Sequence, residues 1–115
     1  EKLFYADDTP AVYMADYIPE GIFTNKRFGR EELRIPIFRL IRKKCGLTAE
    51  TVLMEVDACS VPDEISRELK LQSGATILCT HELAYTFDFK PILWSGVYYR
   101  PGLFKMTLLR KNYLR

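Results

Sequence analysis

The chain has 115 residues, of which 48% are hydrophobic and 28% are charged. This size and composition are those of one globular domain with a single hydrophobic core. The net charge of +2 is too small to indicate a nucleic-acid surface, and no segment has the pattern of a membrane span or a signal peptide. Because the first residue is Glu1 rather than Met, we expect residues 1–115 to be a piece of a longer protein.

Cysteine usage bears on metal binding and on the cellular compartment. The chain has one histidine and an odd number of cysteines, Cys45, Cys59 and Cys79, with no C-x-x-C pair. A structural zinc site needs four such ligands at characteristic spacings, so we expect no metal and no cofactor. Cys59 and Cys79 lie in strand-like segments and are predicted to be small buried hydrophobic residues. This usage fits a reducing compartment and predicts a cytoplasmic protein.

The N-terminal segment predicts a pair of strands. One runs from Lys2 to Ala6 and the next from Ala11 to Ile18, with the turn residues Asp7–Pro10 between them. The stretch from Thr24 to Arg30 is polar and contains a glycine, which is typical of a surface connection.

A helix is predicted after Pro36. Ile37, Leu40 and Ile41 form an apolar stripe at helical spacing, Pro36 suits the first turn, and Gly46 suits the end of the helix. A basic cluster falls in the same segment, where cations complement the negative end of the helix dipole. We favour this interpretation over phosphate binding for its members, Arg39, Arg42, Lys43 and Lys44.

The remainder predicts strands around a second helix. A strand runs from Thr51 to Cys59, with Glu55 and Asp57 on the face turned to solvent or to a polar cleft. A helix begins at Ser60–Glu64, where proline and acids are favoured, and stops at Gln72–Gly74. Three further strands are predicted at Ala75–Phe87, Ile92–Arg100 and Leu103–Leu109, and the last of these closes the domain.

Part of this pattern occurs twice. Pro10–Phe23 and Pro91–Phe104 align without a gap, with proline, tyrosine, glycine and phenylalanine at matching positions. Such a fixed offset predicts a duplicated supersecondary unit, here strand, helix, strand, tight turn, strand. The first copy lacks its opening strand and helix, so we expect the chain to start partway through the duplicated architecture. Antiparallel strands with helices between them predict an α+β fold, one sheet with helices on one face.

Several motifs in this order resemble a known family. They are the helix ending at Cys45–Gly46, the helix-to-strand passage Glu68–Leu78, the Asp-x-x-Pro turn Asp88–Pro91 and the closing Tyr98–Arg100, while Tyr5–Ile18 resembles the family's first hairpin. The chain is similar to the UTRA domain, the effector-binding domain of GntR-type bacterial transcription regulators of the HutC subfamily. That family's fold is related to chorismate pyruvate-lyase.

The resemblance implies a small-molecule effector and a homodimer, and no membrane. It also implies an N-terminal winged-helix domain outside residues 1–115, through which alone the protein would contact DNA. Family members that bind sugar phosphates carry Arg-x-Arg on the first strand and a serine at the helix start, where this chain has Lys2, Phe4 and Pro36. We therefore expect a more apolar effector, or another anionic metabolite, rather than a sugar phosphate.

The candidate effector-binding residues are Arg100, Tyr99, Trp94 and Tyr13. An arginine at the end of an apolar strand needs a partner, either a carboxylate of the protein or an anionic ligand. The three aromatic side chains suit the wall of a small-ligand pocket. The alternative for them is cross-strand pairing within the core.

Catalysis is not expected. His81 and Glu82 are adjacent on a strand and so face opposite sides, and no Ser/His/Asp or Cys/His set has a supporting context. The leading hypothesis is a ligand-sensing and dimerisation domain of a transcription regulator. A lyase-like enzyme on the same fold and a degenerate module kept only for dimerisation are the alternatives.

Overall fold

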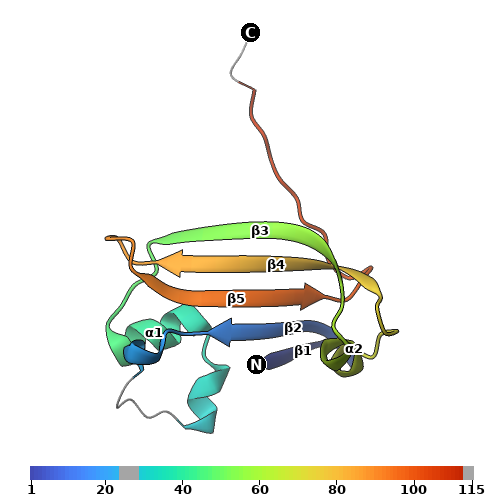
Figure 1. Ribbon diagram of the computed structural model, residues 1–115, viewed down its shortest axis with the longest axis horizontal. Coiled ribbons are helices and arrows are strands. Elements are labelled where there is room, and N and C mark those ends of the chain that lie inside the picture. Colours follow the sequence, from blue (N-terminus) through green and yellow to red (C-terminus); the bar gives the residue numbers. More distant parts are fainter. Residues whose placement is uncertain (24–28, 113–115) are drawn as a thin grey trace.

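The fold is built on one antiparallel sheet of five strands in the order β1-β2-β5-β4-β3 (Figure 1). The computed structural model describes residues 1–23 and 29–112. The predicted connection from Thr24 to Arg30 therefore lies mostly outside the described residues. The strands are β1 (Lys2–Ala6), β2 (Thr9–Tyr17), β3 (Thr51–Ser60), β4 (Thr76–Tyr85) and β5 (Pro91–Tyr99).

The helical elements follow the signals in the sequence. Pro36 occupies the N-cap position of α1 (Ile37–Cys45), and Gly46 ends the helix with φ 68° while its N–H bonds to the carbonyl of Arg42. A left-handed backbone at this position favours glycine, because residues with a Cβ rarely adopt a positive φ. The other elements are α2 (Asp63–Leu69) and the 3-10 turns η1 (Glu20–Ile22) and η2 (Arg30–Arg34). Among the described residues, no helix is long and apolar enough to cross a membrane.

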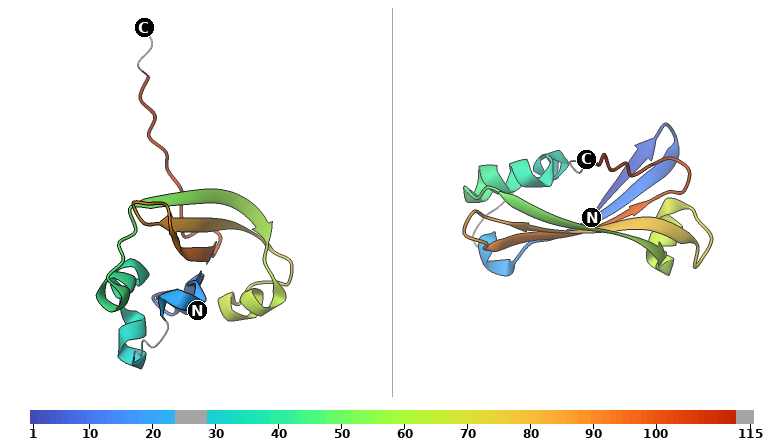
Figure 2. Two further views of the ribbon diagram at one scale, coloured as in Figure 1. Left: turned by 60° about the vertical axis from the view of Figure 1, so that its left-hand side comes forward. Right: turned by 90° about the horizontal axis from the view of Figure 1, so that it is seen from above.

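The two α-helices lie on opposite faces of the sheet, at opposite ends of its strands (Figure 2). The expectation of helices on one face is wrong in this respect, whereas the antiparallel sheet and the α+β class are confirmed. The central strand β5 explains the difference. Ile92 and Leu93 are adjacent and so face opposite sides, yet both are buried. A strand buried on both faces shows no alternation that would assign the helices to one side.

The duplicated stretches form the two central strands. β2 and β5 are each the second strand of a hairpin, β1–β2 and β4–β5, and they pair with each other. Ala15 pairs with Gly96, which is also its counterpart in the sequence alignment. The two hairpins are therefore related by an approximate twofold axis through this pair, perpendicular to the sheet.

The core lies where helix α1 meets the sheet. Ile41 of α1 packs with Ala84, Ile92 and Leu93, and each of the four is at most 2% exposed. Ile18, Ile22 and Phe23 close the cluster from the β2 end, among other partly buried residues. A second, smaller cluster of Ala11, Val12 and Val97 lies nearer the other end of β2 and β5.

One predicted strand is absent. Residues 104–112 form no strand or helix, so the expectation that Leu103–Leu109 closes the domain is wrong for this chain taken alone. The segment leaves the end of β5 and runs past the edge strand β3 (Figure 1). Its alternating pattern indicates a strand, but no strand within residues 1–23 and 29–112 pairs with it.

Candidate functional site

A cleft lies between α1 with η2 and the sheet face that carries Asp16. It consists of two adjoining hollows of about 250 and 320 Å³. Both are lined by Lys2, Asp16 and Ile37, so they form one continuous site. Its size is within the range of pockets that hold small organic molecules.

The sheet register places a polar row on the floor of this cleft. Asp16 of β2 pairs with Ser95 of β5, and Ser95 pairs in turn with Glu82 of β4. Cross-strand partners point to the same face, so the three side chains lie side by side. The Ser95 hydroxyl, only 2% exposed, donates a hydrogen bond to the Asp16 carboxylate. This bond fixes the rotamer of Asp16 and compensates part of the cost of its partial burial.

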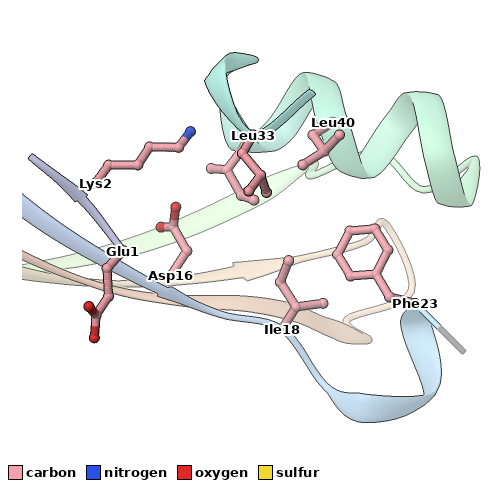
Figure 3. A pocket seen from close by; sticks show the side chains of 8 residues that line it. Glu1, Lys2, Asp16, Ile18, Phe23, Leu33 and Leu40 are labelled. Carbon is pink, nitrogen blue, oxygen red and sulfur yellow. The ribbon is translucent and has the colours of Figure 1, made fainter. Parts of the chain in front are cut away.

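Two cations lie at the helix side of the cleft. The Lys2 ammonium donates to the backbone carbonyl of Ile35, at 3.1 Å, and so ties β1 to the connection between η2 and α1. Figure 3 shows Lys2 reaching over Asp16 toward Leu33. Arg34, an exposed residue of η2, also lines the cleft. The cleft therefore has acids on its floor and cations on the wall above.

The remaining walls are apolar. Phe4 and Phe38 line the larger hollow and keep 45% and 38% of their surface exposed, high values for aromatic residues. A ligand that covered these rings would remove apolar surface from water, the main favourable term in small-molecule binding. The other apolar lining residues are Met14, Ile18, Phe23, Leu33, Pro36, Ile37 and Leu40.

A family comparison matches residues 1–105 to the UTRA domain. The chain belongs to the UTRA domain family. No curated protein sequence is similar enough to count as a match.

Solved structures share the fold of this UTRA domain at low identity. A GntR-family transcriptional regulator from Enterococcus faecalis superposes with a TM-score of 0.78 at 19% identity, over 94% of this chain and 76% of that one. The ligand-binding domain of a Bordetella bronchiseptica regulator assigned to the GntR family gives 0.77 at 18% identity, over 93% and 70%. The YydK chain of Bacillus subtilis gives a TM-score of 0.78 at 18% identity. The match covers 95% of this chain but only 47% of YydK.

Arg100, the first candidate from the sequence, lies at the end of β5, outside the described lining of the cleft. Its Nε donates to the Pro10 carbonyl at 2.7 Å, and its Nη2 donates to the carbonyls of Leu69 and Lys70, the latter at 3.5 Å. The sequence offered a carboxylate or a ligand as its partner, but in this UTRA domain backbone carbonyls take that place. The guanidinium thus joins the C-terminus of α2 to β2.

The aromatic candidates are spread over both faces of the sheet. Trp94 stacks on His81, with ring centroids 5.6 Å apart, and Tyr13 meets Tyr98 edge to face at 6.3 Å. Both pairs lie on the face opposite Asp16. Side chains alternate along β2, so Tyr13 is on the other face from Asp16, and the strand register places Tyr98, Trp94 and His81 on the face of Tyr13. Tyr99 shares the face of Asp16 but contacts Phe104 at 5.3 Å rather than the cleft. The structure therefore does not bring the four candidates together, and their contact with an effector stays a prediction.

Burial and hydrogen bonding alter the pKa values of two groups on that opposite face. Burial raises the pKa of Tyr13 to about 12, helped by a hydrogen bond to Glu1 and by the charge of Glu1. Burial likewise raises the pKa of the Cys59 thiol to about 12, together with a hydrogen bond to Cys79. Both groups are therefore neutral at physiological pH, and neither is a ready nucleophile or base.

Sequence reasoning missed the polar floor of the UTRA domain cleft. The sequence places Asp16 only within the predicted strand from Ala11 to Ile18, and it does not single out Ser95. One signal was available, because Asp16 is an acid in an otherwise apolar and aromatic strand. Lys2, Phe4 and Pro36 were named as departures from the sugar-phosphate pattern, and all three line the cleft.

Proposed function

We propose that this UTRA domain binds a small-molecule effector in the cleft and thereby controls the DNA binding of a transcription regulator of the HutC subfamily. The observation that carries the proposal is the cleft itself, in which exposed aromatic side chains surround a row of polar groups. The similar solved structures support this proposal, because they include GntR-family regulators, one of them a ligand-binding domain. DNA contact would be made by a winged-helix domain outside residues 1–115.

The charges of the cleft bear on the class of effector. A phosphate group carries nearly two negative charges at neutral pH, and Asp16 and Glu82 on the floor would repel it. A monoanionic or zwitterionic molecule with an apolar body fits better. Its carboxylate would meet Lys2 or Arg34, while its body would cover Phe4 and Phe38. We infer that the domain binds this molecule without transforming it, and that it acts as a homodimer.

The proposal is tested by a ligand screen on the purified chain with a cleft-blocking variant. Thermal shift and titration calorimetry would compare aromatic and aliphatic carboxylates, amino acids, amines and sugar phosphates. Ile37→Trp fills the cleft, because Ile37 lines both hollows. Tyr17→Trp is the matched control, since Tyr17 is exposed on the opposite face beside Trp94.

We expect an apolar carboxylate or amino acid to raise the melting temperature of the wild-type chain and of Tyr17→Trp but not of Ile37→Trp. Binding that survives Ile37→Trp and is lost in Tyr17→Trp would move the site to the aromatic face. A dimer that binds no class of compound would favour the dimerisation-only module, and turnover of a bound compound would favour an enzyme.

A further inference from the structure

Two parts of the chain present strand-forming surface without a neighbour. The first is β3, which forms one edge of the sheet, while β1 forms the other. Its apolar side chains are exposed on both faces, at 42% for Val52, 53% for Leu53, 47% for Met54 and 50% for Val56. An edge of this length with unpaired backbone groups and exposed apolar side chains is a template for another strand.

The second is the C-terminal arm, residues 103–110. Its apolar residues are exposed, with Leu108 at 82% and Leu109 at 94%, although the sequence predicts a strand here. The ring of Phe104 rests against Tyr99, and beyond it the arm extends away from its own sheet, past the β3 edge (Figure 1). An apolar segment of this kind gains free energy when it is covered.

The two surfaces are complementary in charge. β3 carries two acids, Glu55 and Asp57, and no lysine or arginine. The arm carries two bases, Lys105 and Arg110, and no acid.

One antiparallel register satisfies both charge and hydrophobicity. With Glu55 opposite Lys105, the residue Glu50, just before β3, falls opposite Arg110. Opposite charges at facing positions stabilise strand pairs, and like charges destabilise them. On the face opposite Glu55, Glu50 and Arg110 lie at one end, and the next three facing pairs are apolar: Val52 with Leu108, Met54 with Met106, and Val56 with Phe104.

The arm is too short to pair with β3 of its own chain in this register. Tyr99 is level with Leu78 of β4, which is level with Ala58 of β3. The outer side of β3 is three strand spacings from β5, roughly 14 Å. From Tyr99 to Leu103 a fully extended chain also spans at most about 14 Å, but the path must go over β4 and β3 and through the turn at Gly102, where φ is 86°.

We infer that the C-terminal arm is exchanged between two copies of this chain, each arm adding an antiparallel strand to the β3 edge of its partner. Such an exchange is reciprocal, so it closes into a twofold dimer. It covers the exposed apolar residues of both β3 and the arm. In the dimer, the segment Leu103–Leu109 also forms the strand that the sequence predicts, because it pairs with β3 of the partner. The inference specifies the homodimer proposed above, but it does not depend on the effector.

The first test compares the full chain with a chain that ends at Phe104. This truncation keeps the contact with Tyr99 and removes the rest of the arm, which forms no helix or strand in the structure. We expect sedimentation equilibrium to show a dimer for the full chain and a monomer for the shortened one across the micromolar range, while the shortened chain keeps the circular dichroism of a folded sheet. A shortened chain that still dimerises within threefold of the same Kd would overturn the arm exchange. A full chain that stays monomeric and melts at a lower temperature after truncation would place the arm on its own sheet instead.

The second test reverses charges. Glu55→Lys and Lys105→Glu should each weaken the dimer about tenfold to hundredfold, because each reversal acts at both arms. The double variant restores opposite charges and should recover most of the affinity. Glu64→Lys, the same change at an exposed position of α2, is the matched control and should leave the Kd unchanged. A double variant no tighter than the single variants would refute the register. Ligand binding measured on each monomeric variant tests the effector proposal separately, because the cleft does not include the arm.

Discussion

Arg100→Ala tests whether the arginine at the end of β5 supports the fold or a ligand. In the structure the guanidinium connects two elements that are far apart in sequence. It bonds to the carbonyl of Pro10, a buried residue in β2, and to the carbonyl of Leu69, a fully buried residue in the last turn of α2. The last four carbonyls of a helix have no partner within it, so Arg100 also serves as a cap for α2.

The expected loss of stability follows from these contacts. A hydrogen bond to a charged group contributes about 1.5–3 kcal/mol, and more is lost when the partner left behind is buried. Arg100 has two short bonds and a weaker one to Lys70 at 3.5 Å. Because Arg100 itself is only half-buried, we take the lower value for each short bond. The sum is about 3 kcal/mol, which corresponds to a fall in melting temperature of roughly 10 °C for a domain of this size.

Melting curves of wild type, Arg100→Ala and Arg100→Lys are the assay, with Arg39→Ala as an exposed-arginine control. We expect Arg100→Lys to recover only part of the loss, because a single ammonium lacks the planar fork that reaches carbonyls of two elements. Arg39→Ala should change the melting temperature little. A melting temperature for Arg100→Ala close to wild type, combined with weaker binding of an anionic compound, would refute the structural role and return Arg100 to the effector site.

Three further predictions concern the core and the titrating groups. Ile41→Ala should lower the free energy of unfolding by about 2–5 kcal/mol, because Ile41 of α1 is only 1% exposed where the helix packs on the sheet. Urea denaturation measures this change, and a smaller loss would mean that the core collapses around the gap. Cys59, whose pKa is raised to about 12 by burial and its bond to Cys79, should react slowly with iodoacetamide at neutral pH, as seen by mass spectrometry of the intact folded chain; labelling as fast as in urea would contradict this environment. Tyr13 has its pKa raised to about 12, mainly by burial, above the value of about 10 of an unfolded tyrosine. Its neutral form therefore stabilises the fold fully below about pH 10, and this contribution is lost as the pH rises toward 12. Stability measured against pH should fall less in Tyr13→Phe over that range, and equal slopes would remove Tyr13 as the cause.

The local features of this chain follow from its sequence. The turn residues and the duplicated stretch predict both hairpins, and Pro36 and Gly46 bound α1 as the sequence indicates. These features depend on neighbouring residues, through steric restriction of φ and through side-chain periodicity. They carry over to the structure with shifts of one or two residues at strand ends, as in β2 and β4.

The candidate site is different, because strand register brings it together. Asp16, Ser95 and Glu82 come from three strands, and their separation along the chain gives no sign that they form a row. The aromatic candidates from the sequence analysis occupy both faces of the sheet. The type of a residue does not show whether its side chain lies on the face of the strand that borders the cleft. The pairing of β2 with β5 decides this question.

The helices and the arm show the same division. An apolar stripe identifies α1, and the proline and acids at its start identify α2. The side of the sheet that each helix covers depends on the two faces of β5, and both faces are apolar, so the sequence pattern of β5 does not distinguish them. Likewise, alternation at Leu103–Leu109 predicts a strand, yet a strand exists only where a second one offers backbone donors and acceptors. Most helices and strands and their ends follow from the sequence, because they depend on interactions between neighbouring residues. The tertiary structure alone decided which side chains meet and that the last segment has no partner in its own sheet, because those depend on contacts between distant residues.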